Sequence, residues 1–164
     1  MSGCELCESA GGEIVWQDAL CRVVRVDDPQ RLDYPGFCRV IWRAHVKEMS
    51  DLNSAERHHL MNLVFAVETA LRKLLQPEKM NLASLGNVVP HLHWHVIPRF
   101  ADDRNFPAPI WAEARRAAAA SVVLTAEIEP GLPLQTLTSP THAVTVMAEG
   151  TSYRVVLANF AEAS

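Results

Sequence analysis

Apolar and β-branched residues concentrate in short runs over the first hundred positions, separated by polar or proline-containing stretches. Runs at 14–16, 21–26 and 36–42 predict three strands, with a loop at 27–35 between the last two. A further strand is expected at 79–83, followed by a turn at Gly86 and Asn87 and an extended segment at 88–98. The pattern is typical of an antiparallel sheet with short connections.

One segment changes from strand-like to helical spacing. Leucine and valine recur every three or four positions between 60 and 75, which predicts an amphipathic helix. Asn53 followed by Glu56 forms a candidate capping box at its start, and Pro77 ends it. This is the long helix of the predicted α+β fold, and an alanine-rich stretch at 111–120 is the candidate for a short second helix.

The last quarter of the chain is less regular. We expect a strand at 121–128, irregular chain at 129–140, and a hairpin joining 144–147 to 153–157 around Glu149 and Gly150. We divide the chain into a catalytic domain at 1–120 and a C-terminal extension at 121–164, which we expect to pack on the same domain.

Composition excludes several classes of protein. The net charge of −4 gives no basic excess for polymeric nucleic acid, so a small nucleotide is the better partner. No apolar run approaches the roughly 20 residues of a membrane span. The N-terminal residues lack the features of a secretory signal, and four unevenly placed cysteines favour reduced thiols. We therefore expect a cytoplasmic protein without membrane association.

Three of the seven histidines, His91, His93 and His95, alternate with apolar residues. On a strand, alternate residues share one face, so the three imidazoles are expected side by side. Such a row suits two chemistries: metal coordination, or attack on phosphorus by a neutral imidazole with neighbouring imidazoles assisting. A single histidine would most often be structural, but three at this spacing indicate a site.

The run His91-Leu-His-Trp-His-Val-Ile97 resembles the motif of the histidine-triad (HIT) superfamily, in which three histidines alternate with apolar residues. The longer run from Lys79 to Arg99 is similar to a bacterial branch related to diadenosine tetraphosphate hydrolases. The resemblance spans about 4–116. It implies a HIT-like antiparallel sheet with one long helix, a homodimer, and a small nucleotide as substrate.

The resemblance assigns different roles to the three catalytic histidines. It implies that His93 attacks the α-phosphorus of a nucleoside 5'-phosphate derivative and is transiently nucleotidylated, after which water releases the monophosphate. His95 would contact the phosphate and assist the leaving group. His91 completes the triad.

The same resemblance implies the substrate-binding residues. Asp27 or Asp28 would accept hydrogen bonds from the ribose hydroxyls, while Asn81 and Asn87 would lie near ribose and phosphate, although Asn87 after Gly86 is also ordinary turn chemistry. Arg99 would help to bind phosphates or would be a solvated arginine. Val88 departs from relatives that carry Ser or Thr there, which leaves leaving-group preference open.

Cys4, Cys7, His45 and His91 correspond to the four zinc ligands of some branches of the superfamily. Two thiolates and two imidazoles form a closed, structural type of zinc site. The alternative is that the cysteines are free and both histidines only form hydrogen bonds. In either case the chemistry itself requires no cofactor.

The predicted function is a nucleotide hydrolase or nucleotidyl transferase acting on dinucleoside polyphosphates or phosphoramidates. Adenylylated amines and nucleotide sugars present the same α-phosphate. Two alternatives stay open: a nucleotide-binding module without catalysis, and a hydrolase that uses the histidine row to bind a catalytic metal.

Overall fold

The computed structural model describes residues 3–26 and 33–116, together with the backbone of strands at 137–138, 142–149 and 152–159. The chain divides into two compact units, Met1–Ser121 and Val122–Ser164. Each is described by itself. Within the described residues, no helix combines the length and apolarity that crossing a membrane requires.

The first unit contains a five-stranded sheet in the order β1-β2-β3-β5-β4, and all its neighbouring strands are antiparallel. The strands are β1 (Glu13–Gln17), β2 (Cys21–Arg25), β3 (Cys38–Trp42), β4 (Lys79–Ala83) and β5 (His93–Arg99). This confirms the predicted antiparallel sheet. The extended segment predicted from residue 88 becomes a strand only at His93, because 87–89 form bends.

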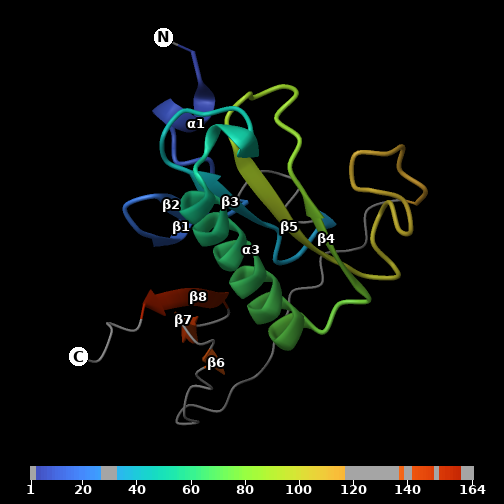
Figure 1. The fold of residues 1–164 in the computed structure, drawn as a ribbon. Coiled ribbons are helices and arrows are strands. Elements are labelled where there is room, and N and C mark those ends of the chain that lie inside the picture. Colours follow the sequence, from blue (N-terminus) through green and yellow to red (C-terminus); the bar gives the residue numbers. More distant parts are fainter. Residues whose placement is uncertain (1–2, 27–32, 117–136, 139–141, 150–151, 160–164) are drawn as a thin grey trace. The chain divides into compact units, whose positions relative to one another are not determined.

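The long helix α3 (Ser54–Leu75) packs against β3 and β5 (Figure 1). Its capping box is formed as predicted: the Asn53 side chain accepts from the Glu56 amide at 3.0 Å, and Glu56 accepts from the Asn53 amide at 2.9 Å. Gln76 ends the helix in the left-handed conformation with φ +46°. The buried side of the helix is aliphatic and comprises Leu60, Leu63, Val64, Ala66, Val67, Ala70 and Leu71.

Two small clusters cover the sheet face that carries His93 and His95. One contains Leu6 of the short helix α1 (Glu5–Glu8), packed with Val24 and Ile41. The other consists of Val26, Tyr34, Phe37 and Ile97, against which Ile110 packs. Because Ile41 pairs with His93 and Ile97 lies two residues after His95, both clusters share the histidine face.

The short second helix is not at its predicted position. Residues 111–116 form turns and bends, and 117–120 lie outside the described residues. A backbone carbonyl in this segment accepts a hydrogen bond from a side chain of the preceding loop, since Asn105 Nδ2 donates to the Ala112 carbonyl at 2.8 Å. Short helical segments occur instead at α1 and at the 3-10 turn η1 (Met49–Asp51).

The second unit contains a sheet in the order β6-β7-β8, formed by Leu137–Thr138, His142–Glu149 and Ser152–Asn159. The predicted hairpin is confirmed, with Met147 opposite Arg154 and Glu149 opposite Ser152. The strand at 137–138 lies in the stretch predicted to be irregular, so that prediction is wrong there. The strand expected at 121–128 falls outside the described residues, and the packing of the extension on the first unit stays a prediction.

Candidate active site

His93 and His95 form a buried pair at the start of β5. Each is 7% exposed, their ring centroids are 4.7 Å apart, and the two Nε2 atoms are separated by 3.1 Å. Both side chains leave the strand on the same face because they are two residues apart. A small group that displaces this contact would therefore meet both Nε2 atoms.

A backbone contact determines which nitrogen of His93 carries the proton and which the lone pair. His93 Nδ1 lies 2.6 Å from the His91 carbonyl oxygen, which can only accept, so Nδ1 carries the proton. In the neutral ring, Nε2 then carries a lone pair and faces His95. His95 Nε2 must donate across the 3.1 Å contact, which places the proton of neutral His95 on that atom.

The surroundings favour neutral imidazoles. Burial lowers the pKa of His93, and the charge of Arg39 on β3 lowers it further, although the hydrogen bond to the His91 carbonyl opposes the shift. Burial, His93 and Arg39 lower the pKa of His95 to about 3. Arg39 faces His95 because the two are cross-strand partners. The pair is therefore uncharged at neutral pH, as a nucleophilic imidazole requires.

Two aromatic rings enclose the imidazole of His95. Phe37 lies 5.6 Å from it between centroids, and Trp111 lies 5.2 Å from it in an edge-on arrangement. His95 Nδ1 is buried and has no hydrogen-bond partner among the described residues. His95 is therefore shielded from solvent on the side of its Nδ1, while its Nε2 faces His93.

His91 does not share the position of the other two histidines, which corrects the prediction of three imidazoles side by side. It precedes β5, and its ring lies against His45 with centroids 5.3 Å apart. Its Nε2 is 2.6 Å from the Trp42 carbonyl oxygen, so Nε2 is the donor and Nδ1 is available as a ligand. Cys4 Sγ and Cys7 Sγ each lie 3.4 Å from that Nδ1.

The structure brings together the four residues predicted to bind zinc. Cys7 Sγ also lies 3.4 Å from His45 Nδ1, and the ligand atoms of Cys4, Cys7, His45 and His91 all lie within 4.8 Å of one another. Two sulfur and two nitrogen donors on a common centre fit a tetrahedral zinc ion. The hydrogen bond from His91 to a carbonyl supplies the outer contact that usually orients a ligating histidine.

A second group of metal-binding residue types, Asp18, Cys21 and His59, has another explanation. The Asp18 carboxylate already accepts from the amides of Leu20 and Cys21 and from His59 Nε2 at 2.7 Å. Burial raises the pKa of the Cys21 thiol to about 12. These contacts hold the β1–β2 turn against α3, and they leave no ready ligand set.

The residues predicted to bind ribose and phosphate lie at different places. Asp27 and Asp28 are outside the described residues, but Val26 just before them donates its amide to the Phe37 carbonyl at 3.0 Å. Asn81 lies on β4, half-buried, opposite Ile97 of β5. Asn87 is exposed in the loop between β4 and β5.

Arg99 is a core residue, so the alternative of a solvated arginine is wrong. It is 1% exposed and forms an ion pair with Asp103, at 2.6 Å from Nε and 3.0 Å from Nη2. Its Nη1 donates to Asn81 Oδ1 at 2.6 Å, and Nη2 donates in addition to the Ala108 carbonyl at 2.8 Å. With the guanidinium engaged in this way, the geometry favours a structural role over phosphate binding.

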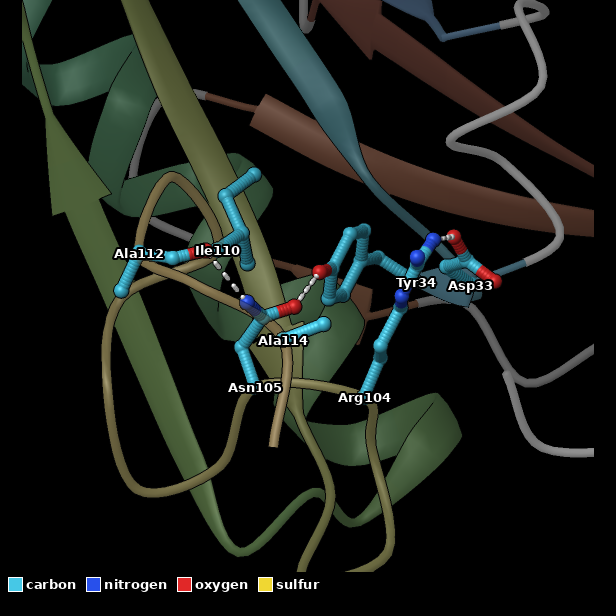
Figure 2. A pocket seen from close by; sticks show the side chains of 7 residues that line it. All are labelled: Asp33, Tyr34, Arg104, Asn105, Ile110, Ala112 and Ala114. Atoms are coloured by element: carbon cyan, nitrogen blue, oxygen red, sulfur yellow. Dashed lines mark hydrogen bonds and ion pairs between the residues drawn. The ribbon is translucent and has the colours of Figure 1, made fainter. Parts of the chain in front are cut away.

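Arg99 and Asp103 anchor the loop that follows β5. Asp103 also accepts from the amides of Asn105 and Phe106, at 2.9 and 2.7 Å. The side chain of Asn105 makes two further contacts (Figure 2). Its Oδ1 accepts from the Tyr34 hydroxyl, and its Nδ2 donates to the Ala112 carbonyl. The loop is thus a hydrogen-bonded wall that holds Trp111 beside His95.

A cavity of about 230 Å³ lies against this wall. Figure 2 shows the Arg104 side chain directed to Asp33. Arg104 Nη1 donates to Asp33 Oδ2 at 3.3 Å. The lining residues are Asp33, Tyr34, Arg104, Asn105, Ile110, Ala112 and Ala114.

Sequence reasoning missed Phe37, Arg39 and Trp111 as neighbours of the histidine pair. Arg39 is placed there by strand pairing and Trp111 by a loop without periodicity, and neither signal can be read from one sequence. For Phe37, only its position at the start of a predicted strand hinted at burial.

A family model for the HIT domain matches residues 9–102. A stretch of 78 residues is 30% identical to AP-4-A phosphorylase of Mycobacterium tuberculosis, covering 44% of this chain and 40% of the relative. The chain therefore matches less than half the length of that protein.

Solved structures show the same fold. A histidine triad protein from Bradyrhizobium japonicum is 29% identical with a TM-score of 0.57, covering 67% of this chain and 80% of its own. A histidine triad (HIT) protein from Sinorhizobium meliloti is 30% identical with a TM-score of 0.56, covering 64% and 77%. One from Marinobacter aquaeolei is 27% identical with a TM-score of 0.57, covering 66% and 77%.

Proposed function

Because this chain belongs to the HIT domain family, we propose that it hydrolyses or transfers the nucleotidyl group of nucleoside 5'-phosphate derivatives, with His93 as the nucleophile. The observation that carries the proposal is the hydrogen bond between His93 Nδ1 and the His91 carbonyl, which leaves the lone pair of the neutral ring on Nε2, the atom that faces His95. Dinucleoside polyphosphates and phosphoramidates are the substrate classes.

The reaction has two displacements at phosphorus. His93 Nε2 attacks the α-phosphorus, a phosphorus–nitrogen bond forms, and the bond from phosphorus to the leaving group breaks. A polyphosphate leaves as an anion and needs no proton, whereas an amine leaving group takes its proton from water. In the second step an acceptor attacks phosphorus and the bond to His93 breaks, which releases the nucleotide and restores the imidazole. When the acceptor is water, its proton passes to the solvent.

His95 supports both displacements as a neutral donor. In the structure its Nε2 proton is donated to His93 Nε2, and once a substrate displaces that contact the same N–H can donate to a phosphate oxygen. Because burial lowers the pKa of His95 to about 3, the ring acts through this N–H rather than through a full positive charge.

The acceptor decides whether the enzyme is a hydrolase or a transferase. Water gives a nucleoside monophosphate, whereas inorganic phosphate gives a nucleoside diphosphate. The printed name of the Mycobacterium tuberculosis relative, a phosphorylase, motivates a test of phosphate as acceptor.

For the substrate, we propose that Asp27 or Asp28 accepts from the ribose hydroxyls and that Asn81 and Asn87 donate to ribose or phosphate oxygens. Asn81 has its carbonyl oxygen turned to Arg99, so its NH₂ group is the part left to donate. Arg99 acts by holding Asn81 in place.

The test uses adenosine 5'-phosphoramidate and a dinucleoside tetraphosphate as substrates. The wild-type protein should release AMP from the first, and rapid acid-free quenching followed by mass spectrometry should show an adenylyl group on His93. His93→Ala should lose roughly 10³-fold or more in turnover while its thermal unfolding is unchanged. Full turnover by His93→Ala would refute the nucleophile.

Two measurements separate the alternatives. Binding of AMP without turnover of any compound would identify a nucleotide-binding module. Loss of turnover on removal of metal, with recovery on adding it back and no adenylylated histidine, would identify a metal-dependent hydrolase.

We further propose that Cys4, Cys7, His45 and His91 hold a structural zinc ion. When bound, zinc would supply four bonds that join the N-terminal segment to the chain before the catalytic strand, and no chemistry at the substrate. Metal analysis of protein prepared without chelator should give about one zinc per chain, and Cys7→Ser should lower it. A content far below one excludes the site.

A homodimer is the proposed assembly. β4 lies at the edge of the sheet among the described strands, so its outer backbone groups are available for pairing with a second copy. Sedimentation analysis should give twice the chain mass, and a monomer at all concentrations would contradict it. Cytoplasmic location stays a proposal, which cell fractionation tests.

A further inference from the structure

The indole of Trp111 is a large apolar surface that the fold leaves partly open beside the catalytic pair. It is 47% exposed although one edge meets His95, with centroids 5.2 Å apart. Flat aromatic surfaces that stay open beside a site are the usual platforms for stacking nucleobases.

The backbone on both sides of Trp111 is fixed. Ile110 before it packs on the cluster that includes Val26 and Phe37, and the carbonyl of Ala112 after it accepts from Asn105 at 2.8 Å (Figure 2). The amide of Ala112 also donates to the Pro109 carbonyl at 3.0 Å. The indole is therefore presented by a built wall, which gives it a defined position.

The position of this wall indicates which part of a nucleotide it meets. The α-phosphate belongs at His93 and His95, while Ile110 contacts the cluster that contains Val26, the last described residue before the predicted ribose acceptors. Trp111 joins these two places, because its ring meets His95 and its neighbour Ile110 packs on the cluster that contains Val26. For a nucleotide that extends from the histidine pair toward Val26, the base is the flat group that would meet the indole.

We propose that Trp111 stacks on the nucleobase and is a specificity-determining residue that favours purine over pyrimidine nucleotides. The inference rests on the proposed function, since it takes the α-phosphate position from the histidine pair. The physical reason is area: a purine has two fused rings to place against the indole, whereas a pyrimidine has one.

The test compares two substrates that differ only in the base, adenosine 5'-phosphoramidate and uridine 5'-phosphoramidate. Stacking of one base typically contributes a factor of about 5 to 150 in binding, so Trp111→Ala should lower kcat/KM for the adenosine compound by that order. The uridine compound should lose less, and the ratio between them should fall. Most of the loss should appear in KM, because stacking is the same before and during the reaction.

Two variants control for structure. Trp111→Phe keeps an aromatic ring and should retain most of the adenosine preference. Phe65→Ala removes an aromatic side chain of similar exposure, 49%, from α3 and should leave the ratio unchanged. Equal losses for both substrates in Trp111→Ala would overturn the proposal, because they would mean that the indole only supports His95. An unchanged adenosine-to-uridine ratio would overturn it as well.

Equilibrium binding separates this proposal from the proposed function. Calorimetric titration with AMP and UMP requires no turnover: Trp111→Ala should weaken AMP binding by about 5- to 150-fold and UMP binding by less. If wild-type protein turns over neither phosphoramidate but shows this binding difference, only the catalytic proposal fails. If it is active but AMP and UMP binding change equally, only the role of Trp111 fails.

Discussion

The buried ion pair between Arg99 and Asp103 predicts a large and specific loss of stability on Asp103→Ala. The two side chains are 1% and 2% exposed, and Asp103 accepts two hydrogen bonds from Arg99 and three from backbone amides. Removing the carboxylate leaves a buried guanidinium without its counter-charge. Such a change typically costs about 3–5 kcal/mol.

The lower end of that range applies here. Arg99 keeps its bonds to Asn81 and to the Ala108 carbonyl, which partly compensate its charge. We therefore expect a loss of about 3 kcal/mol. For a unit of about 120 residues, with an unfolding entropy of roughly 2.1 cal/mol/K per residue, this lowers Tm by about 12 °C.

Urea unfolding followed by tryptophan fluorescence measures this change in the first unit alone. All four tryptophans, Trp16, Trp42, Trp94 and Trp111, lie in it. Arg99→Leu and the double variant complete a double-mutant cycle, in which the double variant should lose clearly less than the sum of the single losses. A loss below about 1 kcal/mol for Asp103→Ala, or additive single losses, would refute the reasoning.

Three further predictions use the same unfolding assay. Burial raises the pKa of Asp103, but hydrogen bonds from Arg99 and two amides outweigh it and hold the pKa below its ordinary value. Its stabilising contribution is therefore complete above about pH 4 and is lost as pH falls through the folded pKa. Asp103→Ala should for this reason flatten the fall of unfolding free energy at acid pH. An unchanged fall would count against this prediction. Gly36 has φ +81°, and an added Cβ would meet Leu75 and Pro98, so Gly36→Ala should cost about 1–2 kcal/mol; a neutral effect would contradict the strain. Asn53→Ala removes the helix cap and should cost about 1 kcal/mol, whereas Asn53→Ser should recover most of it; equal losses in both would argue against capping.

Local patterns carried most of the fold. The helical spacing after Asn53 and the capping box with Glu56 predicted α3, and alternation of apolar residues predicted the strands, because both signals depend on neighbours within a few positions. The helix predicted for the alanine-rich stretch is wrong over 111–116. Asn105 donates to the backbone of this stretch, and the side chain of Arg116 donates to the backbone of the preceding loop. Contacts between distant residues outweighed intrinsic helix propensity there.

The sequence alone determined that three histidines alternate, that Cys4 and Cys7 have ligand spacing, and that the chain resembles HIT proteins. Only the tertiary structure separated the histidines, pairing His93 with His95 and turning His91 to the cysteines. It also placed Trp111 on His95 and took Arg99 into the core. The physical reason is that spacing along a strand specifies only the face from which a side chain projects. The partners that it meets there depend on strand register and on the path of loops, and segments far apart in the chain determine both.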